Sequence, residues 1–322
     1  MKVLIYGAGH FGQALYAVFS HAGHDCLMHI RSAPQADAAQ HRFGLLTVTV
    51  DPPNVDDFNH VFVTTPAAAV PEVLEQVSGK HHQTNLWFVQ KGHLDSEVFR
   101  AGTAWEGVYY FTGSAISENL AAGHKVGMVL SSWLIRKDAL ELIHSVESFR
   151  AYRWDNPCDL LALNRLRTIV SIQRGIADVV LADQPSTWSL VVSSIESEAK
   201  DIAQKIGGGA LARNKEAAAV KVMRIVEADQ ELCSSWQSRN NLFGNNFAKG
   251  MTVEEARREI EQERGVVEGI ENVHGVFEQL HRHGINTERD FPYLHYTKQL
   301  LDGTMTVVQV YEKLDTRREG WI

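Results

Sequence analysis

A glycine-rich turn near the start of the sequence constrains the fold more than any other feature. Residues 2–6 (KVLIY) have the apolar character of a short buried strand, and Gly7, Gly9 and Gly12 follow as G-x-G-x-x-G. An apolar run with helical spacing comes next: Phe11, Ala14, Leu15, Val18 and Phe19. In such a turn the first glycine permits a tight bend, the second lets the backbone approach a pyrophosphate, and the third lets helix and strand pack closely. The pattern predicts dinucleotide binding at a helix N-terminus, with a glycine turn that binds nothing as the alternative.

The first half of the chain alternates between β-like runs and helical segments. We predict strands at residues 2–6, 26–30, 45–50, 60–64, 86–90, 108–112, 125–131 and 148–154. This alternation is typical of an α/β Rossmann-type fold with a doubly wound, mostly parallel sheet. Its ligands are expected beyond the C-terminal ends of the strands.

The sequence changes character near residue 155 and becomes helical in pattern. We predict helices at about 158–180, 187–206, 214–235, 252–262, 268–284, 287–302 and 305–313. Thr252 and Glu255 have the spacing of a capping box at the start of one of them. The chain is therefore predicted to consist of an NAD(P)-binding domain (1–156) and an all-α substrate and catalytic domain (157–322).

Charge and cysteine content narrow the function classes. The 322-residue chain has 31 Lys and Arg against 39 Asp and Glu, which gives a formal net charge of −8. This balance disfavours general nucleic-acid or anionic-membrane binding, although a local basic pocket for a phosphorylated metabolite remains compatible with it. Three cysteines without a C-x-x-C pair favour a reducing compartment over a disulfide framework.

Targeting and metal signals are missing from the sequence. The first predicted strand begins at residue 2 and leaves no room for a signal peptide, and no apolar run approaches the length of a membrane span. The 15 histidines do not show metal-ligand spacing such as H-E-x-x-H. We expect a cytoplasmic protein with no metal, no nucleic-acid partner and no membrane insertion.

The end of the second predicted strand bears on the choice of cofactor. In a Rossmann fold an acidic residue there binds the ribose hydroxyls of NAD, whereas a basic residue accommodates the 2′-phosphate of NADP. This strand ends His29-Ile30-Arg31-Ser32, with an arginine whose planar fork suits a phosphate. The residues favour NADP, or use of both NADP and NAD. The alternative is that Arg31 is only a solvated surface residue.

Several separate motifs point to one family. In order they are GAGHFGQA, VTTPAAAVPEVL, VQKGH, GSAISENLAAG, RTIVSIQRGIAD, SRNNLFG and VVEG, within about residues 1–313. Their order and spacing resemble the bacterial NAD(P)-dependent glycerol-3-phosphate dehydrogenases. The resemblance implies a cytoplasmic oxidoreductase that interconverts dihydroxyacetone phosphate and sn-glycerol 3-phosphate for phospholipid synthesis. It also implies a homodimer.

The resemblance assigns site residues motif by motif. Together with the glycine turn and the end of the second predicted strand, it gives predicted cofactor contacts at Gly7, Gly9, His10, Phe11, Gly12, Arg31, Lys91, Arg239 and Glu268. It implies substrate contacts at Lys91, Gly113, Ser238, Arg239 and Asn240, and catalytic roles for Lys91, Arg167 and Asp229. Chemistry supports two of these assignments: a strand-end lysine such as Lys91 can stabilise developing negative charge, and Arg239 can hold a phosphate bidentately.

Arg167 is the largest departure from the family pattern. The family has a lysine in K-N-V-x-A-x-x-x-G-x-x-D that gives and takes the proton at the carbinol oxygen. Counting back from Asp178 in RTIVSIQRGIAD puts Arg167 at that position, followed by Thr168 in place of asparagine. An arginine stays protonated in proteins, so it can polarise a ketone but serves poorly as a general acid or base.

The departure leaves several explanations open. Lys91 supplies the proton, or a water held by Asp229 does so. Alternatively, the chain acts on another phosphorylated or carboxylated hydroxy-substrate. A non-catalytic sensor that binds NADP(H) is the alternative from a different class of function.

Overall fold

The computed structural model describes residues 1–32, 47–77, 81–91, 105–115, 117–207, 222–225, 228 and 238–316. The chain divides into two compact units: Met1–Leu160 with Asn214–Asp229, and Leu161–Arg213 with Gln230–Ile322. The domain boundary between residues 156 and 157 stays a prediction. Among the described residues no helix combines the length and the apolar character needed to cross a membrane.

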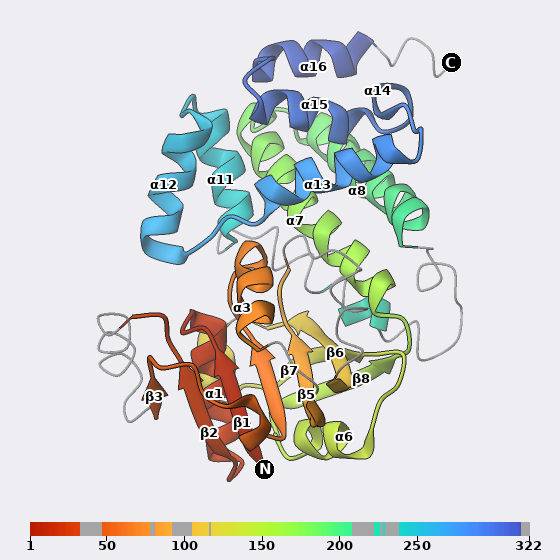
Figure 1. The fold of residues 1–322 in the computed structure, drawn as a ribbon. Helices are drawn as coiled ribbons and strands as arrows, with labels where there is room; N and C mark the ends of the chain where they lie inside the picture. The colour runs from red at the N-terminus through yellow and green to blue at the C-terminus, as the bar shows by residue number, and fades with distance from the viewer. Residues whose placement is uncertain are drawn as a thin grey trace. The chain divides into compact units, whose positions relative to one another are not determined.

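The first unit contains a single sheet with the strand order β3-β2-β1-β4-β5-β6-β7-β8 (Figure 1). The strands are β1 (Lys2–Tyr6), β2 (Asp25–His29), β3 (Val48–Thr49), β4 (His60–Val63), β5 (His81–Phe88), β6 (Trp105–Ser114), β7 (Val126–Ser131) and β8 (Phe149–Trp154). Among these described strands, β6 and β7 are antiparallel and the other neighbours are parallel. The prediction of a doubly wound, mostly parallel sheet is confirmed. The order reverses between β1 and β4, which is where such folds place their ligands.

Helices of the first unit pack on this sheet. They are α1 (His10–His21), α3 (Val70–Gln76), α5 (Ser117–Ala121) and α6 (Lys137–His144), with short 3-10 turns at Val55–Asp57 and Ala67–Ala69. One core cluster joins side chains of α1, α5 and α6 to alternate residues of the strands. Within it the Trp87 ring stacks between Phe62, at a centroid distance of 4.8 Å, and Tyr109, at 4.4 Å. The intervening strand residues are buried too, which explains the continuous apolar runs in the sequence.

The second unit is helical. Its helices are α7 (Pro157–Val180, which starts just before the unit), α8 (Pro185–Ile206), α11 (Arg239–Ala248), α12 (Val253–Arg264), α13 (Gly269–Arg282), α14 (Thr287–Asp290), α15 (Pro292–Leu301) and α16 (Val307–Thr316). The predicted capping box is confirmed: Glu255 N–H donates to Thr252 Oγ1 at 3.2 Å, and Thr252 N–H donates to Glu255 Oε2 at 2.9 Å. The prediction of an α-helical second half is confirmed for the described residues.

Two helix predictions were wrong in detail. The single helix expected over 287–302 is broken into α14 and α15 at Phe291, whose φ and ψ of −140° and 64° are not helical. Pro292 explains the break, because a proline disfavours the helical conformation of the residue before it. Helix α11 was not predicted, and most of the helix expected over 214–235 lies outside the described residues.

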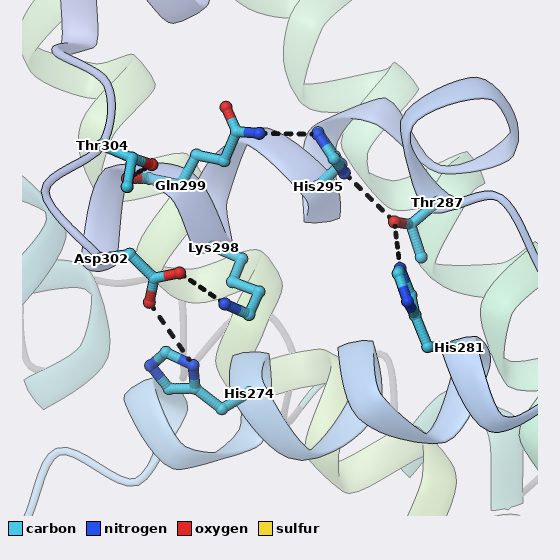
Figure 2. A network of polar contacts seen from close by, with 8 residues as sticks. All are labelled: His274, His281, Thr287, His295, Lys298, Gln299, Asp302 and Thr304. Atoms are coloured by element: carbon cyan, nitrogen blue, oxygen red, sulfur yellow. Dashed lines mark hydrogen bonds and ion pairs between the residues drawn. The ribbon is translucent and has the colours of Figure 1, made fainter.

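A polar network ties the last helices together (Figure 2). Thr287 Oγ1 lies 3.3 Å from His281 Nε2 and 3.1 Å from His295 Nδ1, and so joins α13, α14 and α15. Gln299 Nε2 donates to His295 Nε2 at 2.9 Å, which makes this nitrogen an acceptor. Then His295 Nδ1 carries the proton and donates to Thr287, whose hydroxyl is left to donate to His281.

Candidate active site

The glycine turn is built by close contact between β1, α1 and the end of β4. Gly7 has φ +109°, a value that favours glycine, and a Cβ built on it would lie 3.0 Å from Thr64 Oγ1. A Cβ on Gly12 would lie 2.5 Å from the same hydroxyl oxygen and would overlap the carbonyl oxygen of Gly7. Thr64 Oγ1 itself bonds the carbonyls of Tyr6 and Gly7, both at 2.9 Å. Two of the three glycines are therefore required by packing alone.

The N-terminus of α1 has the properties of an anion site. Gly9 is the N-cap residue, no side chain caps the helix, and its first turn contains no acidic residue. A Cβ built on Gly9 would meet no atom within 4 Å, so space is open above the turn. Uncapped N–H groups at a helix start bind phosphate oxygens. The residues therefore fit the pyrophosphate of a dinucleotide.

His10 and Phe11, expected to contact the cofactor, follow directly. His10 Nδ1 lies 3.5 Å from Glu118 Oε1 of α5. The Phe11 side chain packs on the apolar core, so this residue can reach the cofactor only through its backbone, at the helix N-terminus. At the end of β2, His29 is buried against Tyr6 with a ring centroid distance of 4.7 Å, and burial lowers the pKa of His29. Arg31 follows as an exposed residue.

Lys91 emerges from the sheet just after a buried glutamine that the sequence did not single out. Gln90 Nε2 donates to the carbonyls of Val63, at 2.6 Å, and Thr65, at 3.0 Å, beyond the end of β4. Tyr110 OH donates to the Gln90 carbonyl at 2.8 Å. These bonds fix the segment after β5 to its neighbours on both sides. Lys91 is half-buried at the carboxyl edge of the parallel strands.

Gly113, expected to bind substrate, lies inside β6 and not in a turn after it. It pairs with Met128 of the antiparallel strand β7, and a Cβ built on it would lie 2.7 Å from Met128 Cα. The predicted strand over 108–112 was too short at its C-terminal end. The close approach of β6 and β7 explains why this position is glycine.

In the second unit, α7 and α11 cross in near-backbone contact. A Cβ on Gly175 of α7 would lie 3.1 Å from Asn241 Cα and would overlap the Asn241 carbonyl. A Cβ on Gly244 of α11 would lie 3.0 Å from Ile176 N and would overlap the Ile172 carbonyl. Each helix presents a glycine to the backbone of the other. Their separation is therefore set by main-chain contact.

Polar bonds fix the start of α11 at this crossing. Ser238 is its N-cap and accepts from Asn241 N–H at 3.4 Å, while Ser238 Oγ lies 3.1 Å from Ser171 Oγ of α7. Asn241 Nδ2 donates to Asp178 Oδ2 at 3.1 Å, and Trp188 Nε1 donates to Asp178 Oδ1 at 2.8 Å. The Ser238-Arg239-Asn240 segment is thereby held against α7.

The start of α13 completes this cluster. Asn240 Oδ1 accepts from Gly269 N–H at 2.9 Å, and Glu268 is the half-buried N-cap residue of the helix. A Cβ on Gly269 would lie 3.0 Å from the carbonyl oxygen of Thr168 on α7. Asn272 Nδ2 also donates to Thr168 Oγ1 at 2.7 Å. Three sequence-distant segments therefore meet: 168–172, 238–241 and 268–272.

Arg167 is 1% exposed and is among the largest fully buried side chains. The side chain has interaction partners, yet its Nε and Nη2 atoms are buried and make no hydrogen bond in the described part of the chain.

Arg239 is half-buried, with Nη1 3.3 Å from the Cβ position of Gly265. Asp229 lies outside the described residues. No cluster of three or more metal-ligand side chains occurs among the residues that the structure describes.

Residues 163–312 match the family model described as NAD-dependent glycerol-3-phosphate dehydrogenase C-terminus. The glycerol-3-phosphate dehydrogenase (NAD(P)+) of Shewanella sediminis is 25% identical over an alignment of 324 positions that covers 91% of each chain. The chain thus resembles the glycerol-3-phosphate dehydrogenases, at the low identity of a divergent sequence.

Solved structures of glycerol-3-phosphate dehydrogenases share the fold. That of the Coxiella burnetii enzyme aligns with a TM-score of 0.78 at 18% identity and covers 97% of this chain and 98% of that one. That of the Plasmodium falciparum enzyme aligns with a TM-score of 0.76 at 14% identity and covers 97% and 94%. The Rossmann-type fold with a helical second unit is thus that of known glycerol-3-phosphate dehydrogenases.

Three contacts in and around the candidate site were not predicted from the sequence. Gln90, Thr64 and the Thr168–Asn272 pair act through bonds to segments far away in the chain. A signal existed for Gln90, since an amide in an otherwise apolar strand end needs buried partners. Nothing local in the sequence indicated the Thr168–Asn272 bond.

Proposed function

We propose that the chain is an NAD(P)-dependent oxidoreductase that interconverts a hydroxyl and a ketone on a small phosphorylated metabolite. The observation that carries the proposal is the uncapped α1 N-terminus above the Gly7–Gly12 turn in a glycerol-3-phosphate dehydrogenase relative. The first candidate pair is dihydroxyacetone phosphate and sn-glycerol 3-phosphate, because the relatives are named for it. The protein is also proposed to be cytoplasmic, in keeping with its cysteine content, and to be a homodimer, as the resemblance implies.

The first unit is proposed to hold the dinucleotide. The turn from Gly7 to Gly12, with the N–H groups of His10 and Phe11, would take the pyrophosphate. Arg31, with no carboxylate beside it in 30–32, would take the 2′-phosphate of NADP. The bound dihydronicotinamide supplies the hydride.

The second unit is proposed to hold the substrate. Ser238, Arg239 and Asn240 would bind its phosphate, since N–H groups at a helix start and a guanidinium both favour an oxyanion. Glu268 would contact the cofactor. Burial of Arg167 supports a role for its fixed positive charge in binding or polarising the substrate.

The proton at the carbinol oxygen is proposed to come from Lys91. A lysine can lose and regain a proton, whereas an arginine stays charged. Asp229 is proposed to orient the lysine or the substrate hydroxyl. Gln90 would hold Lys91 in place through its bonds to the end of β4.

The decisive test measures cofactor oxidation with dihydroxyacetone phosphate, with NADPH and NADH side by side. We expect turnover with a higher kcat/KM for NADPH, and Arg31→Ala should raise the KM for NADPH about tenfold and leave that for NADH unchanged. Tight NADPH binding without turnover of any phosphorylated ketone would contradict the enzyme proposal. It would favour the sensor alternative.

A further inference from the structure

The buried amide of Gln90 uses both of its donors on one neighbouring segment. Its Nε2 donates to the carbonyl of Val63, the last residue of β4, at 2.6 Å and to the carbonyl of Thr65 at 3.0 Å. Its Oε1 accepts from Val89 N–H at 3.1 Å. A buried amide costs free energy unless it is bonded, and an apolar side chain would fill the same volume without that cost. The contribution of this residue therefore lies in the place of its bonds.

These bonds begin where the main-chain pairing of β4 and β5 ends. The register of the two strands closes with the pair Val63 and Phe88. Two residues further on, the Gln90 side chain connects the same two segments, and its own carbonyl accepts from Tyr110 OH of β6 at 2.8 Å. Lys91 follows directly. The main chain that carries Lys91 is thus fixed to the neighbouring strands on both sides.

The segment 63–65 that receives the Gln90 bonds also holds the glycine turn. Thr64 N–H donates to the Tyr6 carbonyl at 2.8 Å, and Thr64 Oγ1 lies 2.9 Å from the carbonyls of Tyr6 and Gly7. Thr65 N lies 3.0 Å from the Cβ position of Gly7. A continuous set of contacts within the first unit therefore runs from the glycine turn through residues 63–65 to Gln90 and the residue after it.

Thr84 makes a comparable connection at the opposite end of β5. Its Oγ1 donates to the Phe58 carbonyl at 2.8 Å and lies 3.4 Å from the Val55 carbonyl, and both of these residues precede β4. The side chain is buried, as that of Gln90 is. Because this end of the strand is remote from the carboxyl edge of the sheet, Thr84 separates the general effect of tying β5 to its neighbour from the particular effect of Gln90.

We propose that Gln90 is a positioning residue that couples Lys91 to the dinucleotide turn. By bonding residues 63–65, which hold the turn, it fixes Lys91 where the lysine amine contacts a dinucleotide bound on Gly7–Gly12. This inference rests on the proposed cofactor site. The turn keeps its own bonds to Thr64 when Gln90 is replaced, so the loss of Gln90 removes the contribution of Lys91 and leaves the rest of the dinucleotide site in place.

A double-mutant cycle on NADPH binding, measured by fluorescence titration, tests this coupling. Lys91→Ala should raise the Kd for NADPH about tenfold, as the loss of one charge-assisted bond gives. Gln90→Met has a similar length but no donor, and should raise the Kd about fivefold. The double variant should stay near tenfold, because a lysine that is no longer held contributes little, whereas independent effects would multiply to about fiftyfold.

Two further variants guard the cycle. Thr84→Val keeps the shape of the side chain and removes its hydroxyl bond at the other end of β5, and should leave the Kd for NADPH within about twofold. An equal rise in Kd for Thr84→Val and Gln90→Met would show that a loosened sheet is sufficient, and would overturn the assignment to Gln90. If Gln90→Met does not fold, Gln90→Asn takes its place, because it keeps an amide but is one methylene too short to bond both carbonyls.

The outcomes separate this inference from the proposed function. Effects of Lys91→Ala and Gln90→Met that multiply, or a Kd that Lys91→Ala leaves unchanged, would overturn the inference, while reduction of a phosphorylated ketone would keep the proposed function standing. The expected cycle without turnover of any such ketone would support the inference and contradict the proposed reaction. A protein that does not bind NADPH would contradict both.

Discussion

Asn241 donates a hydrogen bond from Nδ2 to Asp178 Oδ2 over 3.1 Å, and this bond joins α11 to α7. The other carboxylate oxygen accepts from Trp188 Nε1 of α8 at 2.8 Å. One carboxylate therefore links three helices next to the segment proposed to bind phosphate.

Asp178→Asn should lower the free energy of unfolding by about 1.5–3 kcal/mol, because one of the two donors would face an amide nitrogen. Chemical denaturation measures the loss. The control is Asp183→Asn, at an exposed position, which should change stability by less than about 0.5 kcal/mol. Equal stability of the two variants would show that the bonds to Asp178 contribute nothing.

Gly12 and Gly9 should respond to alanine in opposite ways. Gly12→Ala drives a methyl group into Thr64 and the Gly7 carbonyl, so it should destabilise the first unit by about 2–3 kcal/mol. Gly9→Ala meets no atom and should change stability by less than about 1 kcal/mol. It should nevertheless raise the Kd for NADPH about tenfold, because the methyl group would occupy the pyrophosphate space. Unchanged NADPH binding by Gly9→Ala, in a fluorescence titration, would place the pyrophosphate elsewhere.

His60 should make the protein acid-sensitive. It is fully buried, its Nδ1 accepts from Trp87 Nε1 at 3.2 Å, and burial lowers its pKa from 6.5 to about 4. Because the unfolded chain binds the proton more readily, the stabilisation is complete above the unfolded pKa and is lost as the pH falls towards the folded pKa. Because of His60, the free energy of unfolding should fall by roughly 3 kcal/mol as the pH is lowered from about 7 to about 4.

His60→Gln removes the titration, so the variant should lose less stability than the unmodified protein over this pH range in denaturant titrations. His124→Gln, at an exposed position, is the control and should keep the slope of the unmodified protein. Parallel curves for the unmodified protein and His60→Gln would rule out His60 as the cause.

Thr287 should be a stability determinant of the network in Figure 2. Thr287→Val keeps the shape but leaves two imidazole nitrogens without their shared hydroxyl, so it should cost about 1–3 kcal/mol. Thr304→Val removes one bond to the Gln299 carbonyl at an exposed position and should cost less than about 1 kcal/mol. Thermal unfolding compares the two, and a larger effect of Thr304→Val would contradict the network's role.

Local features of the sequence were sufficient for the sheet and for the glycine turn. Each glycine acts within its own turn, and the apolar strand runs reflect burial on both faces of the sheet. Helix α11 was missed because RNNLFGNNFA is rich in asparagine and contains glycine, which are weak helix formers. It is stabilised by tertiary packing, with Phe243 fully buried and Gly244 against α7.

The side-chain hydrogen bonds of the candidate site could not be predicted from the sequence, for a different reason. Thr168 and Asn272 are 104 residues apart, and a hydroxyl and an amide have no periodicity that would pair them. Gln90 bonds to carbonyls of another strand, which depend on the strand order. The spacing from Asp178 was enough to align Arg167 with the lysine position of the family pattern. It could not predict that the Arg167 side chain is buried or which of its nitrogens make hydrogen bonds.

Gly175 of α7 and Gly244 of α11 set the spacing of the two helices independently of the side chains that are proposed to bind substrate. Since Gly175 and Gly244 bring main chain against main chain, no variable side chain sets the spacing of the two helices. A substitution at Arg167 or Arg239, both proposed to bind substrate, should therefore leave the spacing of the helices that carry these positions unchanged. Such a frame allows substrate preference to drift by single substitutions, and it offers the same route to redesign in the laboratory.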